Sequence, residues 1–235
     1  MAEPVWLALA LATLAGASIP VGAWLAAWRV GLLPDWVKTE ARHGVMAFGA
    51  GALLAAVALV LIPEGTARLP AVPALFCFVL GGIGFAVIDR ILSQSGSKVS
   101  QFLAMMMDYV PEALALGAVI AGDLASAVLV ALLICLQNLP ESFNAMREMS
   151  DQGPTPSLWL FAAMVPIGPF AAWVGLSLPG SFNPIIGGVM MFSAGGILYL
   201  MFEDIAPEVP LANTYLPPLG AVLGFALGLA GDLLI

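Results

Sequence analysis

Two short polar motifs lie inside the most apolar part of the chain, and their residue types are those that bind cations. Residues 108–112 read Asp-Tyr-Val-Pro-Glu and residues 137–141 read Gln-Asn-Leu-Pro-Glu, while the sequence around them is mainly Leu, Ala, Val, Ile and Met. Because positions i and i+4 of a helix share one face, the acid or amide that begins each motif lies on the same face as the glutamate that ends it. The proline in each motif removes a backbone donor and frees a nearby carbonyl oxygen.

The carboxylates of these motifs need a compensating charge if the apolar segments span a membrane. Each charged side chain at the middle of a bilayer costs roughly 2.5–3.5 kcal/mol, and the motifs hold three of them, Asp108, Glu112 and Glu141. No Lys or Arg lies between Lys98 and Arg147. A bound cation or protons are therefore the candidates for the compensating charge.

Five residues of the motifs are candidate metal ligands, and all of them offer oxygen. They are Asp108, Glu112, Gln137, Asn138 and Glu141. Oxygen ligands suit Mg²⁺, Mn²⁺ and Ca²⁺, and Zn²⁺ also binds carboxylates, at about 2.0–2.2 Å. The chain has no phosphate-binding loop of the Gly-x-x-x-x-Gly-Lys-Ser/Thr type, so we expect no organic cofactor, and we do not expect an enzyme.

A second interpretation of these residues involves packing alone. In it, Glu112 and Glu141 are protonated carboxyls that only hydrogen-bond between helices, and Asp108 pairs with Gln137 through a proton. Gln137 and Asn138, taken alone, are more often interhelical hydrogen bonders than ligands, and Asn138 points about 100° away from Gln137 on a helix. Two glutamates in matching positions favour a binding site over packing.

The composition places the whole chain in a membrane. Of its 235 residues, 61% are hydrophobic and 9% are charged, and the mean hydropathy is +1.03, which no soluble domain of this length matches. At about 20 residues per crossing, the sequence predicts an all-α polytopic membrane protein with eight helices in one transmembrane domain, residues 1–235. Many acids lie within or beside the apolar spans despite the net charge of −8, so we expect the lipid bilayer and metal cations as partners and no nucleic acid.

Stretches rich in Pro, Gly, Ser and Asn separate the eight predicted helices. These helices cover residues 4–28, 43–63, 70–92, 100–121, 124–149, 158–178, 185–205 and 216–235. The first has no basic residue before it and too long an apolar run for a signal peptide. Six of the seven basic residues fall on one side of this arrangement and only Arg68 on the other. The positive-inside rule then places both termini outside.

The two motifs and their positions resemble those of the ZIP (Zrt/Irt-like) family of divalent metal transporters. That family carries His-Asn-x-Pro-Glu-Gly in its fourth helix and His/Gln-Asn/Asp-x-Pro-Glu-Gly in its fifth, where residues 108–113 and 137–142 stand here. The resemblance implies inverted repeats of three helices packed around helices 4 and 5. It also implies a homodimer in a bacterial inner or plasma membrane, with zinc or the related Mn, Fe or Cd as transported substrate.

The chain departs from the family pattern at four positions of the site. Asp108 stands where helix 4 of the family has His, and Tyr109 stands where it has Asn. Gly168 replaces a Glu of helix 6, and Glu203 replaces a His of helix 7. The resemblance then implies an altered primary metal site and the loss of a second one.

Three acids lie at the cytoplasmic end of the seventh predicted helix, in residues 203–208, which resemble an acidic segment of the family. They are Glu203, Asp204 and Glu208. We weigh two interpretations of them, a solvated helix face and an exit relay for cations.

Three classes of function fit these observations, and we favour a membrane transporter of divalent metal cations. The second class is a non-transporting or proton-coupled ZIP-like protein, in which the polar residues sense ions or stabilise a dimer. The third is an intramembrane hydrolase that uses paired carboxylates as general acid and base. The sequence contains neither a Gly-x-Gly-Asp nor a His-Glu-x-x-His motif to support the third class.

Overall fold

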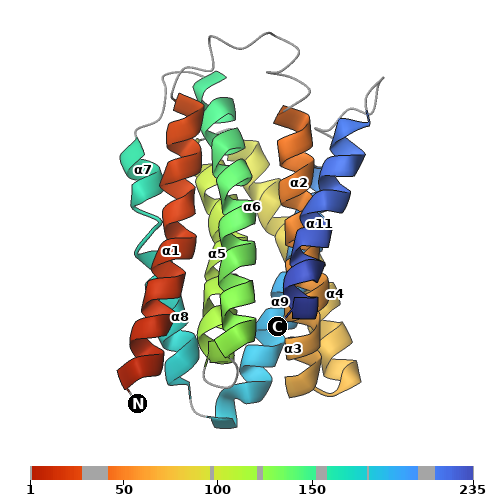
Figure 1. Ribbon diagram of the computed structural model, residues 1–235. Helices are drawn as coiled ribbons and strands as arrows, with labels where there is room; N and C mark the ends of the chain where they lie inside the picture. Colours follow the sequence, from red (N-terminus) through yellow and green to blue (C-terminus); the bar gives the residue numbers. More distant parts are fainter. Residues whose placement is uncertain are drawn as a thin grey trace.

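The chain forms a bundle of long helices. The computed structural model describes residues 2–27, 42–95, 98–120, 124–151, 158–178, 180–205 and 215–234, and within these ranges it contains helices and short turns but no strand. Seven helices of the described part are long and apolar enough to cross a membrane. The chain is therefore an all-α polytopic membrane protein, and its N and C ends lie at the same end of the bundle (Figure 1).

Several of the spans consist of more than one helical segment. The segments are α1 (Ala2–Ala27), α2 (Arg42–Ala55), η3 (Ala56–Leu61), α3 (Ile62–Arg68), α4 (Ala71–Ser95), α5 (Lys98–Ile120), α6 (Leu124–Asp151), α7 (Leu158–Ala162), α8 (Ile167–Ser177), η4 (Gly180–Phe182), α9 (Asn183–Leu200), η5 (Met201–Ile205) and α11 (Leu216–Leu234). The predicted fold class is confirmed at the level of an all-α membrane protein. The segments α2, η3 and α3 together make one crossing.

The second span continues five residues beyond its predicted end at Pro63. The segment η3 is π-helical, and the N–H of Ile62 bonds the carbonyl of Val57, five residues back. Pro63 follows directly and has no N–H to extend an α-helical ladder. The wider π turn ends one helical segment there and lets the next begin with proline in its first turn, where it is tolerated. The span then runs on to Arg68.

The span predicted over residues 158–178 is two helices rather than one. Between α7 and α8 the N–H groups of Met164 and Val165 bond carbonyls three residues back, at 3.2 Å each. Pro166 and Pro169 lie at the start of α8 and cannot donate to a helix that runs through from α7. The tighter turn joins α7 and α8 within one span.

Helices α5 and α6 lie in the middle of the bundle, next to each other (Figure 1). On one side, α1 packs against α6 and α8, and α8 packs against α5. On the other side, α2 packs against α11 and α6, while α9 packs against α4 and α5. The outer helices α4 and α11 leave most of their apolar side chains exposed, as expected for surfaces in contact with lipid.

Glycines allow the outer helix pairs to approach at backbone distance. A Cβ atom on Gly51 of α2 would lie 2.0 Å from the carbonyl oxygen of Ala221 in α11. A Cβ on Gly195 of α9 would lie 1.9 Å from the carbonyl oxygen of Phe78 in α4. Membrane helices gain little from apolar burial against each other, so close packing of this kind holds them together. These contacts place the inner helices and so position the polar motifs.

Candidate cation-binding site

The polar residues of the first motif lie on the buried face of α5. Glu112 is 1% exposed and Asp108 is 3% exposed. On a helix these two positions are neighbours on one face. The buried face of α5 is directed at α6, α8 and α9, which pack around it. The i, i+4 spacing that suggested a joint site therefore places both carboxyl groups inside the bundle.

Helix α6 brings Gln137 to Glu112. The Nε2 atom of Gln137, which is 2% exposed, donates a hydrogen bond of 2.5 Å to Oε2 of Glu112. The alternative pairing of Gln137 with Asp108 is not what the structure shows. Asp108 instead accepts a hydrogen bond of 2.8 Å from the backbone N–H of Tyr109. One hydrogen bond between α5 and α6 therefore joins the two motifs at the level of Glu112.

The same contact leaves two acceptor atoms without a partner. Within the described part of the chain, neither Oε1 of Glu112 nor Oε1 of Gln137 has a hydrogen-bond donor, and both atoms are buried. Neither Asp108 nor Glu112 forms an ion pair with a basic side chain among the described residues. Buried polar groups in folded proteins are almost always satisfied. A bound cation, or a proton, would satisfy these two buried acceptors.

The other two predicted ligands differ in their surroundings. Asn138 is buried, and its Nδ2 donor has no partner in the described chain. Glu141 is half-buried and lies one helical turn nearer the Arg147 end of α6. The described residues hold no group of three or more His, Cys, Asp and Glu side chains arranged to bind a metal. The structure thus brings Asp108, Glu112 and Gln137 together without adding Glu141 as a third carboxylate.

The three acids at the end of the seventh span lie far from this cluster in the sequence. Glu203 is exposed in the π-helical segment η5. The backbone of Asp204 belongs to the same segment, and Glu208 lies outside the described residues. An exit relay formed by the three acids stays a prediction.

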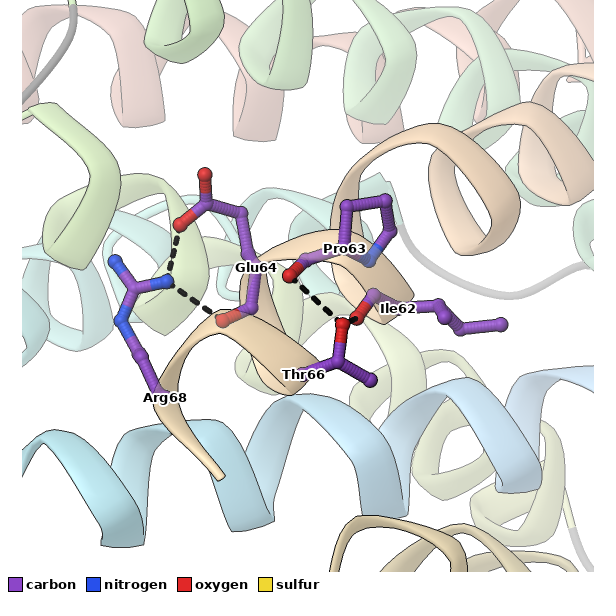
Figure 2. A network of polar contacts seen from close by, with 5 residues as sticks. All are labelled: Ile62, Pro63, Glu64, Thr66 and Arg68. Carbon is purple, nitrogen blue, oxygen red and sulfur yellow. Dashed lines mark hydrogen bonds and ion pairs between the residues drawn. The ribbon is translucent and has the colours of Figure 1, made fainter. Parts of the chain in front are cut away.

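Another Pro-Glu pair, Pro63-Glu64, lies near the end of the second span and was not among the residues predicted to form the site (Figure 2). The Arg68 guanidinium contacts the carboxylate of Glu64 and donates a 2.8 Å hydrogen bond to the Glu64 carbonyl oxygen. Nearby, the Thr66 hydroxyl donates to the carbonyl of Ile62, at 2.8 Å, and lies 3.1 Å from that of Pro63. The pair was detectable because Pro63-Glu64 repeats the ending of both motifs, with Arg68 at i+4 from the acid. Here the glutamate already has its counter-charge.

Comparisons with known proteins do not assign the chain to a family. No protein-family model matches it, and no curated protein matches it. The fold and the site define the class of the protein. It is an all-α membrane protein with a buried acid–amide cluster between two central helices.

Proposed function

We propose that this protein is a transporter of divalent metal cations with a ZIP-like architecture. The observation that carries the proposal is the pair of unpartnered oxygens, Oε1 of Glu112 and Oε1 of Gln137, in a buried cluster that also holds Asp108. Both atoms are hydrogen-bond acceptors, and oxygen acceptors are the groups that a hard or borderline divalent cation binds. The same cation would supply the charge that a buried acidic pair lacks inside a membrane.

The ligand chemistry favours a hard or borderline divalent cation. Asp108, Glu112 and Gln137 offer carboxylate and amide oxygen, with no imidazole and no thiolate. Oxygen sets of this kind bind Mn²⁺ and also accept Zn²⁺. Manganese and zinc are therefore the first substrates to test, with Fe²⁺ and Cd²⁺ next.

The arrangement of helix contacts supports inverted repeats. To compare the two halves, we match the first three spans with the last three in the same order, and we match α5 with α6. The contact of α1 with α6 then becomes that of α8 with α5, and the contact of α2 with α11 becomes that of α9 with α4. The contact of α2 with α6 becomes that of α9 with α5. The second and seventh spans, which are matched with each other, each contain a π-helical segment, η3 in the second and η5 in the seventh.

Inverted repeats suit transport because each repeat crosses the membrane an odd number of times. Two such repeats have opposite orientations, and their rocking exposes a central site to one side and then to the other. The candidate site lies between α5 and α6, and helices of both sets of three spans pack against these two helices. The proposal includes both termini outside and a homodimer in a bacterial inner or plasma membrane.

A second candidate function rests on the missing third carboxylate. Because Glu141 does not complete a three-acid group with Asp108 and Glu112, a proton-coupled or non-transporting ion sensor with the same fold also fits. Such a protein would bind the cation without moving it. Flux measurements separate the two candidates, since both predict binding.

Uptake into proteoliposomes tests the proposal. Purified protein is reconstituted with a metal-sensitive dye inside, and Mn²⁺ or Zn²⁺ is added outside. We expect saturable uptake that falls about tenfold or more in Glu112→Gln, because one charged ligand is lost. Asp232→Asn makes the same chemical change at an exposed position of α11 and serves as the matched control. Uptake no faster than in empty liposomes, or equal uptake by wild type and Glu112→Gln, would contradict transport through this site.

A further inference from the structure

An apolar groove lies between α4, α5 and α9, outside the cluster of Asp108, Glu112 and Gln137. Its volume is about 740 Å³, within the range of roughly 300–1,000 Å³ that is usual for sites of small organic ligands. The described residues that line it include no charged side chain. The hydroxyl of Ser193, which lines the groove, already donates a 2.8 Å hydrogen bond to the carbonyl of Val189. The groove therefore suits a ligand that makes no polar contact.

The groove opens on the surface that α4 presents to lipid. Leu80 and Ile88 of α4 line it and are 40% and 39% exposed, and Ile185 of α9 lines it and is 58% exposed. Both helices belong to spans that are long and apolar enough to cross a membrane. The opening is therefore continuous with the lipid-facing surface of α4, and the molecules next to it are the acyl chains of the bilayer.

The two halves of the chain share one register at this place. Residues 44–48 read Gly-Val-Met-Ala-Phe in α2, and residues 188–192 read Gly-Val-Met-Met-Phe in α9. A Cβ atom on Gly224 of α11 would lie 2.0 Å from the carbonyl oxygen of Phe48, and a Cβ on Gly81 of α4 would lie 1.8 Å from that of Phe192. The pair of α2 and α11 therefore corresponds to the pair of α9 and α4.

The corresponding place in the first half is closed. Ser193 of α9 corresponds to Gly49 of α2, and a Cβ on Gly49 would lie 2.6 Å from Cγ of Pro140 in α6. Ile88 of α4 corresponds to Gly231 of α11, where a Cβ would meet a side chain of α6 at 2.4 Å. Glycines thus let α2 and α11 pack directly on α6, whereas the larger residues at the matching positions line an open groove beside α5. The groove is a feature of one half and does not follow from the helix arrangement alone.

We propose that this groove binds one acyl chain of a membrane lipid. An empty groove would forfeit dispersion contacts that an apolar chain restores, and the surface around the opening supplies such chains. The inference goes beyond the proposed function and does not depend on it. The bound chain would lie against Met107 and Pro111 of α5, which directly precede Asp108 and Glu112 in the sequence. Lipid binding would therefore bear on the helix that carries the acidic pair.

Lipid retained by the purified protein tests the proposal. The protein is reconstituted in vesicles of phosphatidylcholine that carries a photoreactive diazirine in one acyl chain. One portion is extracted in mild detergent and weighed intact by native mass spectrometry, and a second is irradiated so that peptide mapping locates the labelled residues.

Two variants fill the groove from α9, and a third is their control. They are Val189→Phe and Gly188→Leu, both at residues that line the groove. The nearest atom to a Cβ on Gly188 would be 3.6 Å away, so the added side chain enters the groove without a clash at its root. Val222→Phe makes the same change as Val189→Phe on the exposed, lipid-facing surface of α11 and is the matched control.

We expect wild type and Val222→Phe to retain one phospholipid per chain in detergent and to be labelled on α5 between Met106 and Pro111. Val189→Phe and Gly188→Leu should lose both the retained lipid and this label. Wild type without retained lipid, or groove variants that retain as much as wild type, would overturn the proposal.

Two further outcomes are also decisive. Lipid-free wild-type dimers that dissociate in the groove variants would overturn the proposal, because the groove would then be an interface between two copies of the chain. If neither groove variant folds, the label in wild type decides. Label on α5 between Met106 and Pro111 supports the bound acyl chain, and label confined to the exposed faces of α4 and α11 overturns it.

Discussion

The two Pro-Glu motifs have nearly the same sequence but different environments. Glu112 of the first motif is fully buried and accepts a hydrogen bond from Gln137 of the second. Glu141 of the second motif is half-buried. Because Gln137 lies level with Glu112 and Glu141 follows it by four residues, Glu141 lies about one helical turn nearer the Arg147 end of α6 than Glu112 does. Each motif places an acid within a central helix, and the packing around that helix decides how accessible the acid is.

This difference suggests separate roles for the two glutamates. We infer that Glu112 is the fixed ligand of the cation, since its surroundings hold it in place. Glu141 is reached first from the side of the membrane on which Arg147 lies, and it would pass the cation to or from the buried pair.

Replacing Glu112 by Ala removes the charged ligand and leaves the Gln137 amide without its acceptor. We expect affinity for Mn²⁺ and Zn²⁺ to fall by about 100-fold, because a buried hydrogen-bonded charge contributes about 1.5–3 kcal/mol. Calorimetry in detergent measures it. Met106→Leu, on the same helix but outside the acid–amide cluster, changes shape little and is the control. Equal affinities in wild type and Glu112→Ala would place the site elsewhere.

Replacing Glu141 by Ala tests whether the second glutamate binds the cation as tightly as Glu112 does. Its half-buried carboxylate is partly solvated, so its removal weakens affinity less, by about tenfold or below. We expect a larger effect on the rate of uptake into proteoliposomes than on equilibrium binding. If Glu141→Ala lost as much affinity as Glu112→Ala, the two glutamates would be equivalent ligands and the division of roles would be wrong.

Replacing Asp108 by His tests which atoms touch the metal. An imidazole beside Glu112 should raise the ratio of Zn²⁺ to Mn²⁺ affinity severalfold, because nitrogen ligands favour zinc. In wild type, protons compete with the cation for the carboxylates, so binding should weaken as the pH falls from about 7.5 to about 5. Paired affinities for both metals at two pH values measure both effects. An unchanged metal ratio would mean that residue 108 does not contact the cation, and binding that ignored pH would count against a carboxylate site.

The membrane class and the burial of the first motif could be predicted from the sequence, because both depend on patterns within single helices. Long apolar runs must be helical in lipid, because an α-helix makes all of its backbone hydrogen bonds within its own segment. Spacing of i and i+4 then placed Asp108 and Glu112 on one face. The π-helical segment before Pro63 and the break between α7 and α8 were missed, because proline signals a disturbance without saying how the neighbouring turns absorb it.

Contacts between helices were beyond the sequence pattern. The packing interpretation paired Gln137 with Asp108, whereas Gln137 bonds Glu112, since the relative height of α5 and α6 depends on how all the helices pack. The Tyr109 hydroxyl likewise packs against both Gly16 and Gly168, which belong to helices far apart in the chain. Periodicity within one helix carries no information on such a pairing.

An anomalous-scattering map of crystals grown with Zn²⁺ would locate the cation. We expect one zinc peak per chain between α5 and α6, bonded to Oε1 of Glu112 and Oε1 of Gln137 at about 2.0–2.2 Å. We also expect the peak to disappear in Glu112→Ala crystals grown under the same conditions. A wild-type map without a peak between these oxygens, or with zinc bound only at other residues, would contradict the proposed site.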